Sequence, residues 1–245
     1  MDNDRTSRSK RLLGEEGVRM LEGACVAVIG LGGVGSACAE SLARAGVGRF
    51  LFVDKDVVEP SNINRQAIAF MSTIGQRKVD VMERMAQDIN PDAQIATLHA
   101  FVLEETIDEL LAPFERPSFI VDAVDTLTAK AAIAAYAERR GIPAVSAMGM
   151  ANRSDPTALR FARLFATEGC PFCREMRKIC RSRGIADMDV LYSTERPAKV
   201  RPVEGAARSE KTELGTHSYM PPVAGLMLAG YVVQHLLHPT QGASL

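Results

Sequence analysis

The sequence predicts an α/β protein: a Rossmann-like, mainly parallel sheet with helices on both faces, followed by an irregular C-terminal region with a basic helix and a final helix. Three features of the 245-residue chain support this fold class. Short apolar runs alternate with helix-like segments as far as Met150, a glycine-rich loop follows the first apolar run, and an aspartate follows the second. Alternating strands and helices give a parallel sheet that helices cover on both faces.

The elements of the first half come in order after a basic arm, residues 1–22, which runs into a short helical stretch. Strands are expected over residues 25–29, 49–53, 94–98, 119–121 and 144–147. Helices are expected over residues 34–45, 75–89, 104–111 and 126–140. Asn90-Pro91 ends the second of these helices, because proline cannot continue the helical hydrogen bonds and disfavours helix at the residue before it.

Beyond Met150 the alternation is lost. Residues 151–220 are expected to be irregular except for a helix near residues 172–183, and a final helix begins after Pro221-Pro222. We expect one domain over residues 1–245, with residues 1–150 as its core and arm and residues 151–245 as a substrate region with the closing helix.

The composition favours a cytoplasmic protein. Lys plus Arg (29) nearly balances Asp plus Glu (30), so contact with nucleic acid would depend on local patches. No apolar run reaches the roughly 18–20 residues that span a bilayer, and the N-terminus lacks a signal-peptide pattern. The cysteines number five, and we expect them to be reduced thiols.

The loop GLGGVG, residues 30–35, predicts a nucleotide site. Gly30, Gly32 and Gly35 fit the dinucleotide fingerprint, and Gly33 also gives the form that carboxylate-adenylating enzymes use. Such a loop lets backbone N–H groups approach a phosphate at a helix N-terminus. Asp54, which ends the second strand, suits a hydrogen bond to ribose. At this point the nucleotide is either NAD or ATP.

The residues after the second strand favour ATP. Its triphosphate needs more cations and hydrogen-bond donors than the two phosphates of NAD. Arg65 and Lys78 are suitable cations, and Asn62 and Gln66 supply amide donors. Two aspartates at strand ends, Asp56 and Asp125, offer the oxygen ligands that Mg²⁺ prefers.

These residues resemble the ubiquitin-activating, ThiF/MoeB-like superfamily, whose members adenylate a carboxylate. The motifs are Gly30 to Gly35, Asp54-x-Asp56, Ser61-Asn62-x-x-Arg65-Gln66, Gly75-x-x-Lys78 and Asp122-x-x-Asp125. The resemblance implies Asp54 on the ribose, Asn62, Arg65 and Lys78 on the phosphates, and Asp125 at magnesium. It also implies a homodimer in which Arg8 or Arg11 crosses into the partner's site. We assign Asp56, Gln66 and Val102 to the ATP site as well, and Arg65, Lys78 and Asp125 to catalysis.

The second half differs from the superfamily members that activate sulfur carriers, which carry two CxxC pairs on zinc. Here one pair exists, Cys170 with Cys173, and Cys180 follows. A structural zinc site takes four ligands, so we expect no structural zinc and treat these cysteines as reduced thiols packed on a helix face. A site completed by Cys180 and one of His217, His235 or His238 is the weaker alternative. A redox pair is weaker still.

The segments VSAMGMANRSDPTALR, CPFCREMRKICRSRGI and VLYSTE, residues 145–160, 170–185 and 190–195, are similar to the tRNA threonylcarbamoyladenosine dehydratases. That resemblance implies ATP-dependent activation of the threonyl carboxylate on N6-threonylcarbamoyladenosine at tRNA position 37, followed by cyclisation with loss of water. It requires no catalytic cysteine. The general base for ring closure stays open; His217 is a candidate, although a structural or surface histidine is the more common case.

The helix near residues 172–183 is predicted to be amphipathic, with one apolar stripe at helical spacing. Its other positions are strongly basic. We expect these basic residues to contact tRNA phosphates, with Lys199 and Arg201 extending the patch; they are Arg174, Arg177, Lys178, Arg181 and Arg183. A solvated charged face is the other interpretation.

Three other functions remain open: adenylation of the C-terminus of a ubiquitin-like sulfur-carrier protein, NAD-dependent dehydrogenation, and nucleotide sensing without catalysis. The missing second CxxC pair argues against the first. Hydride transfer has no need of the donors between Asn62 and Lys78, which argues against the second.

Overall fold

A seven-stranded sheet forms the centre of the computed structural model, which describes residues 5–112, 116–199 and 214–239. Its strands are β1 (Cys25–Ile29), β2 (Arg49–Val53), β3 (Gln94–Leu98), β4 (Phe119–Asp122), β5 (Ala144–Ala147), β6 (Leu159–Arg163) and β7 (Asp189–Ser193). The strand order is β3-β2-β1-β4-β5-β7-β6. Neighbouring strands are parallel except for the antiparallel pair β6 and β7, which confirms the predicted mainly parallel sheet.

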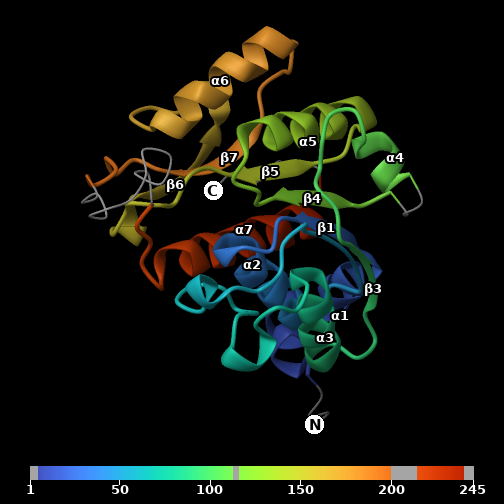
Figure 1. Ribbon diagram of the computed structural model, residues 1–245. Coiled ribbons are helices and arrows are strands. Elements are labelled where there is room, and N and C mark those ends of the chain that lie inside the picture. Colours follow the sequence, from blue (N-terminus) through green and yellow to red (C-terminus); the bar gives the residue numbers. More distant parts are fainter. Residues whose placement is uncertain (1–4, 113–115, 200–213, 240–245) are drawn as a thin grey trace.

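Helices cover both faces of this sheet (Figure 1). One face carries α1 (Ser7–Gly23), α2 (Gly33–Ala45), α3 (Lys78–Ile89) and α7 (Met220–Leu237), and the other carries α4 (Ile107–Leu111), α5 (Leu127–Arg140) and α6 (Pro171–Arg183). Short 3₁₀ helices lie at Pro60–Asn62, Met71–Thr73, Pro156–Ala158 and Leu164–Ala166. Because the sheet is buried on both sides, β1 and β4 are buried along their full length.

The region after Met150 is more regular than expected, and this corrects the sequence prediction. β6 and β7 extend the sheet beyond β5, with β7 paired to β5 and β6 at the edge. Their length equals that of β1, β2 and β3, but β6 runs antiparallel to β7, and their pairing brings together segments far apart in sequence. The basic helix is where it was expected, and its observed start is Pro171.

The N-terminal arm is also more ordered than predicted. It forms α1, with a break at Gly14, whose φ of 71° interrupts the helical backbone. The helices expected from residues 75 and 104 begin later, at Lys78 and Ile107. The residues around Gly75 and those before Ile107 are therefore part of the loops that follow β2 and β3 at the carboxyl end of the sheet.

The helix α7 is long and apolar enough to cross a membrane by length and composition, whereas the sequence analysis judged its apolar run too short. In the fold it packs closely along α2 and also contacts α1, β4 and β5. Packing within the core explains its apolar character without a membrane.

Candidate functional site

A cavity of about 570 Å³ opens at the carboxyl ends of β1, β2, β4 and β5. The order of the sheet reverses here, because β1 is flanked by β2 on one side and β4 on the other. In open parallel sheets, ligands bind at this kind of reversal. The lining includes every residue predicted for the ATP site except Gly35, which lies in the first turn of α2.

The glycine loop connects β1 to α2, and it needs glycine for steric reasons. Gly30 has a φ of 92°, and a Cβ there would lie 2.7 Å from the backbone of Ala123. A Cβ at Gly35 would lie 1.8 Å from the carbonyl oxygen of Gly30. The loop therefore folds tightly onto the start of α2, whose first N–H groups have no acceptor within the helix and are available for a phosphate.

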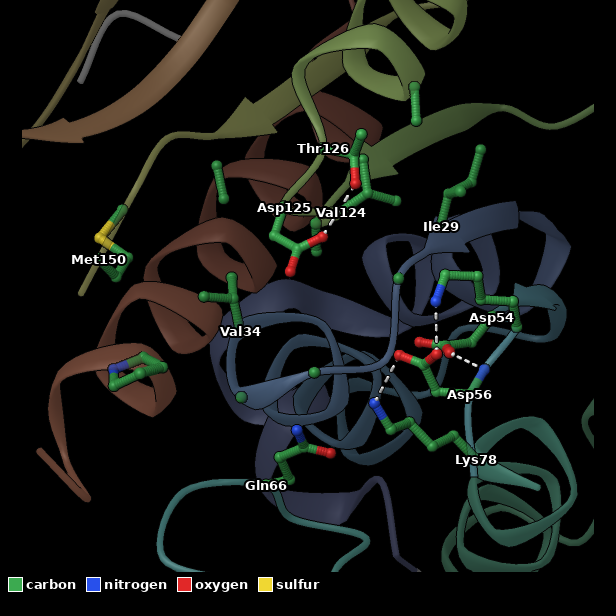
Figure 2. A pocket seen from close by; sticks show the side chains of 18 of the residues that line it. Ile29, Val34, Asp54, Asp56, Gln66, Lys78, Val124, Asp125, Thr126 and Met150 are labelled. Carbon is green, nitrogen blue, oxygen red and sulfur yellow. Dashed lines mark hydrogen bonds and ion pairs between the residues drawn. The ribbon is translucent and has the colours of Figure 1, made fainter. Parts of the chain in front are cut away.

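Asp54 holds this loop in place from the end of β2. One carboxylate oxygen accepts the N–H of Leu31 at 2.6 Å, and the other accepts the N–H of Asp56 at 2.8 Å (Figure 2). Asp54 is buried and lines the cavity. Its carboxylate thus orders two backbone segments at the wall of the cavity.

Asp56 and Lys78 form an ion pair on the same side of the cavity. Lys78 Nζ lies 3.3 Å from Asp56 Oδ2, and Lys55 Nζ lies 2.7 Å from Oδ1. Partial burial works against ionisation of Asp56, but the hydrogen bonds and charges of Lys55 and Lys78 hold its pKa below the usual value. Lys78 is only 6% exposed, so its ammonium is directed into the cavity and not into bulk water. Asp56 therefore pairs with two lysines here, which makes it a poorer magnesium ligand than the sequence suggested.

The first 3₁₀ helix and the residues after it supply other polar groups of the cavity. Asn62 is buried and accepts the N–H of Glu59 at 3.1 Å, which fixes its amide. Gln66 is also buried, and its Oε1 has no hydrogen-bond partner among the described residues. Arg65 is half-buried, and its Nη1 contacts the carbonyl of Ser61 at 2.9 Å. The Gln66 oxygen is an acceptor, so a buried oxygen of this kind needs a donor, which a bound ligand or a water would supply.

Asp125 faces this group from the opposite wall, in the loop after β4 (Figure 2). It is exposed to the cavity and accepts a hydrogen bond of 3.2 Å from Thr126. One carboxylate beside a phosphate site is the usual protein contribution to bound Mg²⁺, which keeps waters and phosphate oxygens as its other ligands. Val102 is buried and lines the cavity after β3.

A buried cluster that the sequence pattern does not predict lies beside the loop of Asp125. Lys130 on α5 is 1% exposed, and its Nζ lies 3.2 Å from both oxygens of Asp122 and 3.1 Å from Ser146 Oγ. Burial lowers the pKa of Lys130, whereas Asp122 opposes that shift. Asp122 also accepts the N–H of Val124 at 3.2 Å, so the cluster orders the loop that carries Asp125. A single lysine within the alanine-rich run of α5 was the available signal.

All five cysteines are buried free thiols. Within the described residues, no group of three or more His, Cys, Asp or Glu side chains is placed to hold a metal ion.

The basic helix α6 is less uniformly exposed than predicted. Arg177 points inward and donates to the carbonyl of Thr167 at 2.8 Å, and Arg183 pairs with Glu104 at 2.6 Å. Four of the basic residues are nevertheless exposed: Arg174, Lys178, Arg181 and Arg183. Arg174 and Lys178 also pair with Glu175. Lys199 is exposed, and Arg201 lies outside the described residues.

Arg8 and Arg11 are exposed on α1 and do not line the cavity of their own chain. His217 lies beside the cavity wall, next to Thr216, which lines it. Its Nε2 is 3.0 Å from Ser154 Oγ, and its ring stacks on Tyr219.

Together, the glycine loop, the buried carboxylate of Asp54 and the cations that line the cavity define a nucleotide-binding α/β protein with a site suited to a triphosphate. The sequence profile of the ThiF family matches residues 5–244. The tRNA threonylcarbamoyladenosine dehydratase of Bacillus subtilis is 39% identical over 241 residues, which cover 94% of each chain. The chain therefore belongs to the ThiF family and, within it, to the tRNA threonylcarbamoyladenosine dehydratases.

Solved structures agree with this placement. The crystal structure of the Escherichia coli tRNA N6-threonylcarbamoyladenosine dehydratase, TcdA, in complex with ATP superposes with a TM-score of 0.86. It is 27% identical and covers 96% of this chain and 94% of its own. By contrast, the molybdopterin-synthase adenylyltransferase of Salmonella typhimurium, at 33% identity, is similar over only 54% of this chain and 51% of its own. The similarity to the dehydratases thus extends through the second half of the chain.

Proposed function

We propose that the protein is an ATP-dependent enzyme that dehydrates N6-threonylcarbamoyladenosine at position 37 of tRNA. One observation carries the proposal: a cavity equipped for a triphosphate lies in a chain whose full-length relatives are tRNA threonylcarbamoyladenosine dehydratases. Adenylation of a sulfur carrier's C-terminus is the alternative, and the similarity over about half of the chain makes it the weaker one.

In the first step, the threonyl carboxylate attacks the α-phosphorus of ATP, and pyrophosphate leaves. Negative charge grows on the phosphate oxygens as the bond to pyrophosphate breaks. Lys78 and Arg65 neutralise this charge, and the amides of Asn62 and Gln66 donate hydrogen bonds to it. Asp54 accepts hydrogen bonds from ribose, and Val102 packs against the nucleotide. Asp125 would hold Mg²⁺, which would supply further charge neutralisation on the phosphates.

In the second step, a nitrogen or oxygen of the substrate attacks the activated acyl carbon, and AMP leaves. The sum of both steps removes one water from the nucleoside and converts ATP to AMP and pyrophosphate. The contribution of the protein to ring closure is mainly to hold the reacting atoms together. The cavity wall that would do this includes Gly149, Met150, Ala151, Leu214 and Thr216.

The assembly that we propose is a cytoplasmic homodimer. An arginine of α1, Arg8 or Arg11, reaches the site of the partner subunit, and the outer face of α6 contacts tRNA phosphates. Residues 1–150 provide the nucleotide-binding part of the domain, and residues 151–245 provide the substrate part.

The test is to incubate the protein with ATP, Mg²⁺ and bulk tRNA and to analyse the digested nucleosides by mass spectrometry. The expected result is a threonylcarbamoyl nucleoside that has lost the mass of one water, with AMP formed in equal amount. An unchanged nucleoside, together with AMP formation on a sulfur carrier that ends in Gly-Gly, would establish the alternative.

A further inference from the structure

The CxxC segment has no part in the proposed mechanism, yet the fold gives its two sulfurs different environments. Cys170 is the N-cap residue of α6, and Cys173 lies in the first turn of the helix. The exposed fractions of these residues are 3% and 0%. Cys170 makes no side-chain capping hydrogen bond, but the nearby backbone N–H groups of Phe172 and Cys173 favour its ionised form and lower its pKa. A helix N-terminus favours the ionised form of a thiol.

A buried guanidinium adds a full positive charge beside this sulfur. Arg153 is 2% exposed, and its Nη2 lies 3.4 Å from Cys170 Sγ. Its Nε donates to the carbonyl of Gly149 at 3.2 Å, and its Nη1 donates to the carbonyl of Glu195. The carboxylate of Glu195 is engaged instead by the N–H groups of Ser154 and Asp155.

A buried cation requires an anion, because leaving it unpaired in the interior is costly. Backbone carbonyls carry no net charge, and within the described residues Arg153 forms no ion pair with a carboxylate. The thiolate of Cys170 is the group in contact with Arg153 that can supply the negative charge. The fold therefore selects an ionised Cys170.

The two thiols consequently differ in acidity. A hydrogen bond from the Cys173 thiol, the helix N–H groups and Arg153 together lower the pKa of Cys170 to about 6, although burial opposes the shift. The hydrogen bond with Cys170 and burial raise the pKa of Cys173. These shifts favour a thiolate at Cys170, with the thiol of Cys173 protonated three residues further along the chain. A guanidinium at the thiolate also disfavours a metal cation at this position.

We propose that Cys170 and Cys173 form a redox modification site that a hydroperoxide oxidises to a disulfide. The Cys170 thiolate attacks one oxygen of the peroxide, the O–O bond breaks, and hydroxide leaves, which gives a sulfenic acid. The Cys173 sulfur then attacks the sulfenic sulfur, and its proton leaves with the hydroxyl group as water. For hydrogen peroxide, one thiolate, one thiol and one peroxide give one disulfide, one water and one hydroxide.

The site is coupled to the nucleotide cavity through Phe172, which lies between the two cysteines in sequence and lines the cavity. A Cβ placed at Gly149 would lie 3.6 Å from the Phe172 side chain, and the Gly149 carbonyl accepts from Arg153. Disulfide formation removes the anion that Arg153 faces and constrains the first turn that carries Phe172. We expect oxidation to weaken ATP binding; this part rests on the proposed function.

The test begins with intact-mass spectrometry of the full-length protein treated with hydrogen peroxide. Wild type should lose two hydrogens, map to a Cys170–Cys173 bond and recover with dithiothreitol. Cys173→Ser should instead form a sulfenic acid on Cys170 that dimedone traps, and Cys170→Ser should form neither product. Cys180→Ser, a buried cysteine of the same helix, is the matched control and should behave as wild type. A bond between other cysteines, or equal reactivity of Cys170→Ser and wild type, would overturn the proposal.

A second measurement uses the wild-type protein and so does not depend on how the variants fold. The rate of alkylation of Cys170 by iodoacetamide should rise with pH around a midpoint near the Cys170 pKa of about 6. A midpoint near the ordinary thiol value of about 8.5 would contradict an ionised Cys170. Neither measurement requires tRNA or enzymatic turnover. A negative result would therefore disprove the redox site without bearing on the proposed function, and the reverse also holds. The Kd for ATP of reduced and oxidised protein then tests the coupling, with an equal Kd disproving it.

Discussion

At the scale of single residues, the site separates into groups that hold the cavity and groups that face the ligand. Asp54 and the Lys130–Asp122–Ser146 cluster hold backbone segments through buried hydrogen bonds. Lys78, Arg65 and Gln66 have fewer constraints and line the open space. This division decides which substitutions should change catalysis and leave the fold intact.

Lys78→Ala should reduce ATP–pyrophosphate exchange by roughly 100-fold or more, the typical effect of removing one group that stabilises transition-state charge. The circular dichroism spectrum should remain that of the folded protein. Arg77→Ala is the matched control, because Arg77 is the preceding residue, is exposed and does not line the cavity. Wild-type exchange in Lys78→Ala would remove Lys78 from catalysis.

Arg65→Ala should have a similar effect on the exchange reaction, because its half-buried side chain lines the cavity and supplies positive charge there. Its Nη1 donates to oxygens of Ser61 and Asn64, which hold the guanidinium at the cavity. The Kd for ATP should rise as well. An unchanged Kd and an unchanged exchange rate would show that the guanidinium keeps its local partners when ATP binds.

At the scale of elements, α2 and α7 pack closely because glycine allows their backbones to approach. A Cβ on Gly225 would lie 2.3 Å from the Val34 carbonyl oxygen and 2.9 Å from the backbone nitrogen of Cys38. Backbone atoms cannot move aside as a flexible side chain can. The start of α2 carries the glycine loop, so this contact also supports the nucleotide site.

Gly225→Ala should lower the free energy of unfolding by about 1–3 kcal/mol, the usual cost of overpacking, measured by urea denaturation. Gly230→Ala is the matched control on the same helix, because nothing lies within 4 Å of a Cβ there. That variant should be more stable by roughly 0.5–1 kcal/mol, since alanine is the better helix former. Equal stability of the two variants would disprove the close contact.

The elements also explain how far the sequence could predict the fold. Five strands and the glycine loop could be predicted because each has a local sequence signal: an apolar run, a glycine or a proline. Strands β6 and β7 carry weaker signals, and their place depends on pairing with β5 across the sheet. Lys130 could not be predicted for a related reason: it lies on α5, and its partners Asp122 and Ser146 lie on β4 and β5. Long-range pairing is not visible in a local pattern.

At the scale of the whole molecule, charge is nearly balanced, and the outer face of α6 is a local exception. The substitution of Arg174, Lys178 and Arg181 together by alanine should weaken tRNA binding and reduce the slope of log K against log salt by roughly 2–3, if each side chain contacts one phosphate. The Kd for ATP should not change. Fluorescence anisotropy with labelled tRNA over a salt series measures both the affinity and the slope.

The charge-matched control is alanine at Arg19, Arg44 and Arg84, exposed residues of α1, α2 and α3 on the opposite face of the sheet. If this control loses as much of the salt dependence as the α6 variant, the contact with tRNA is not specific to α6.

The position of α7 in the chain has a consequence for biosynthesis. The ribosome synthesises every strand of the described sheet before it synthesises α7. The apolar surfaces of α2, β4 and β5 that α7 covers therefore remain exposed to solvent until translation has passed Leu237. Nascent chains with uncovered apolar surface are the species that chaperones hold and that aggregate. Translation of an mRNA that is truncated before the codon for Met220 should therefore yield an insoluble polypeptide and not a shorter active enzyme.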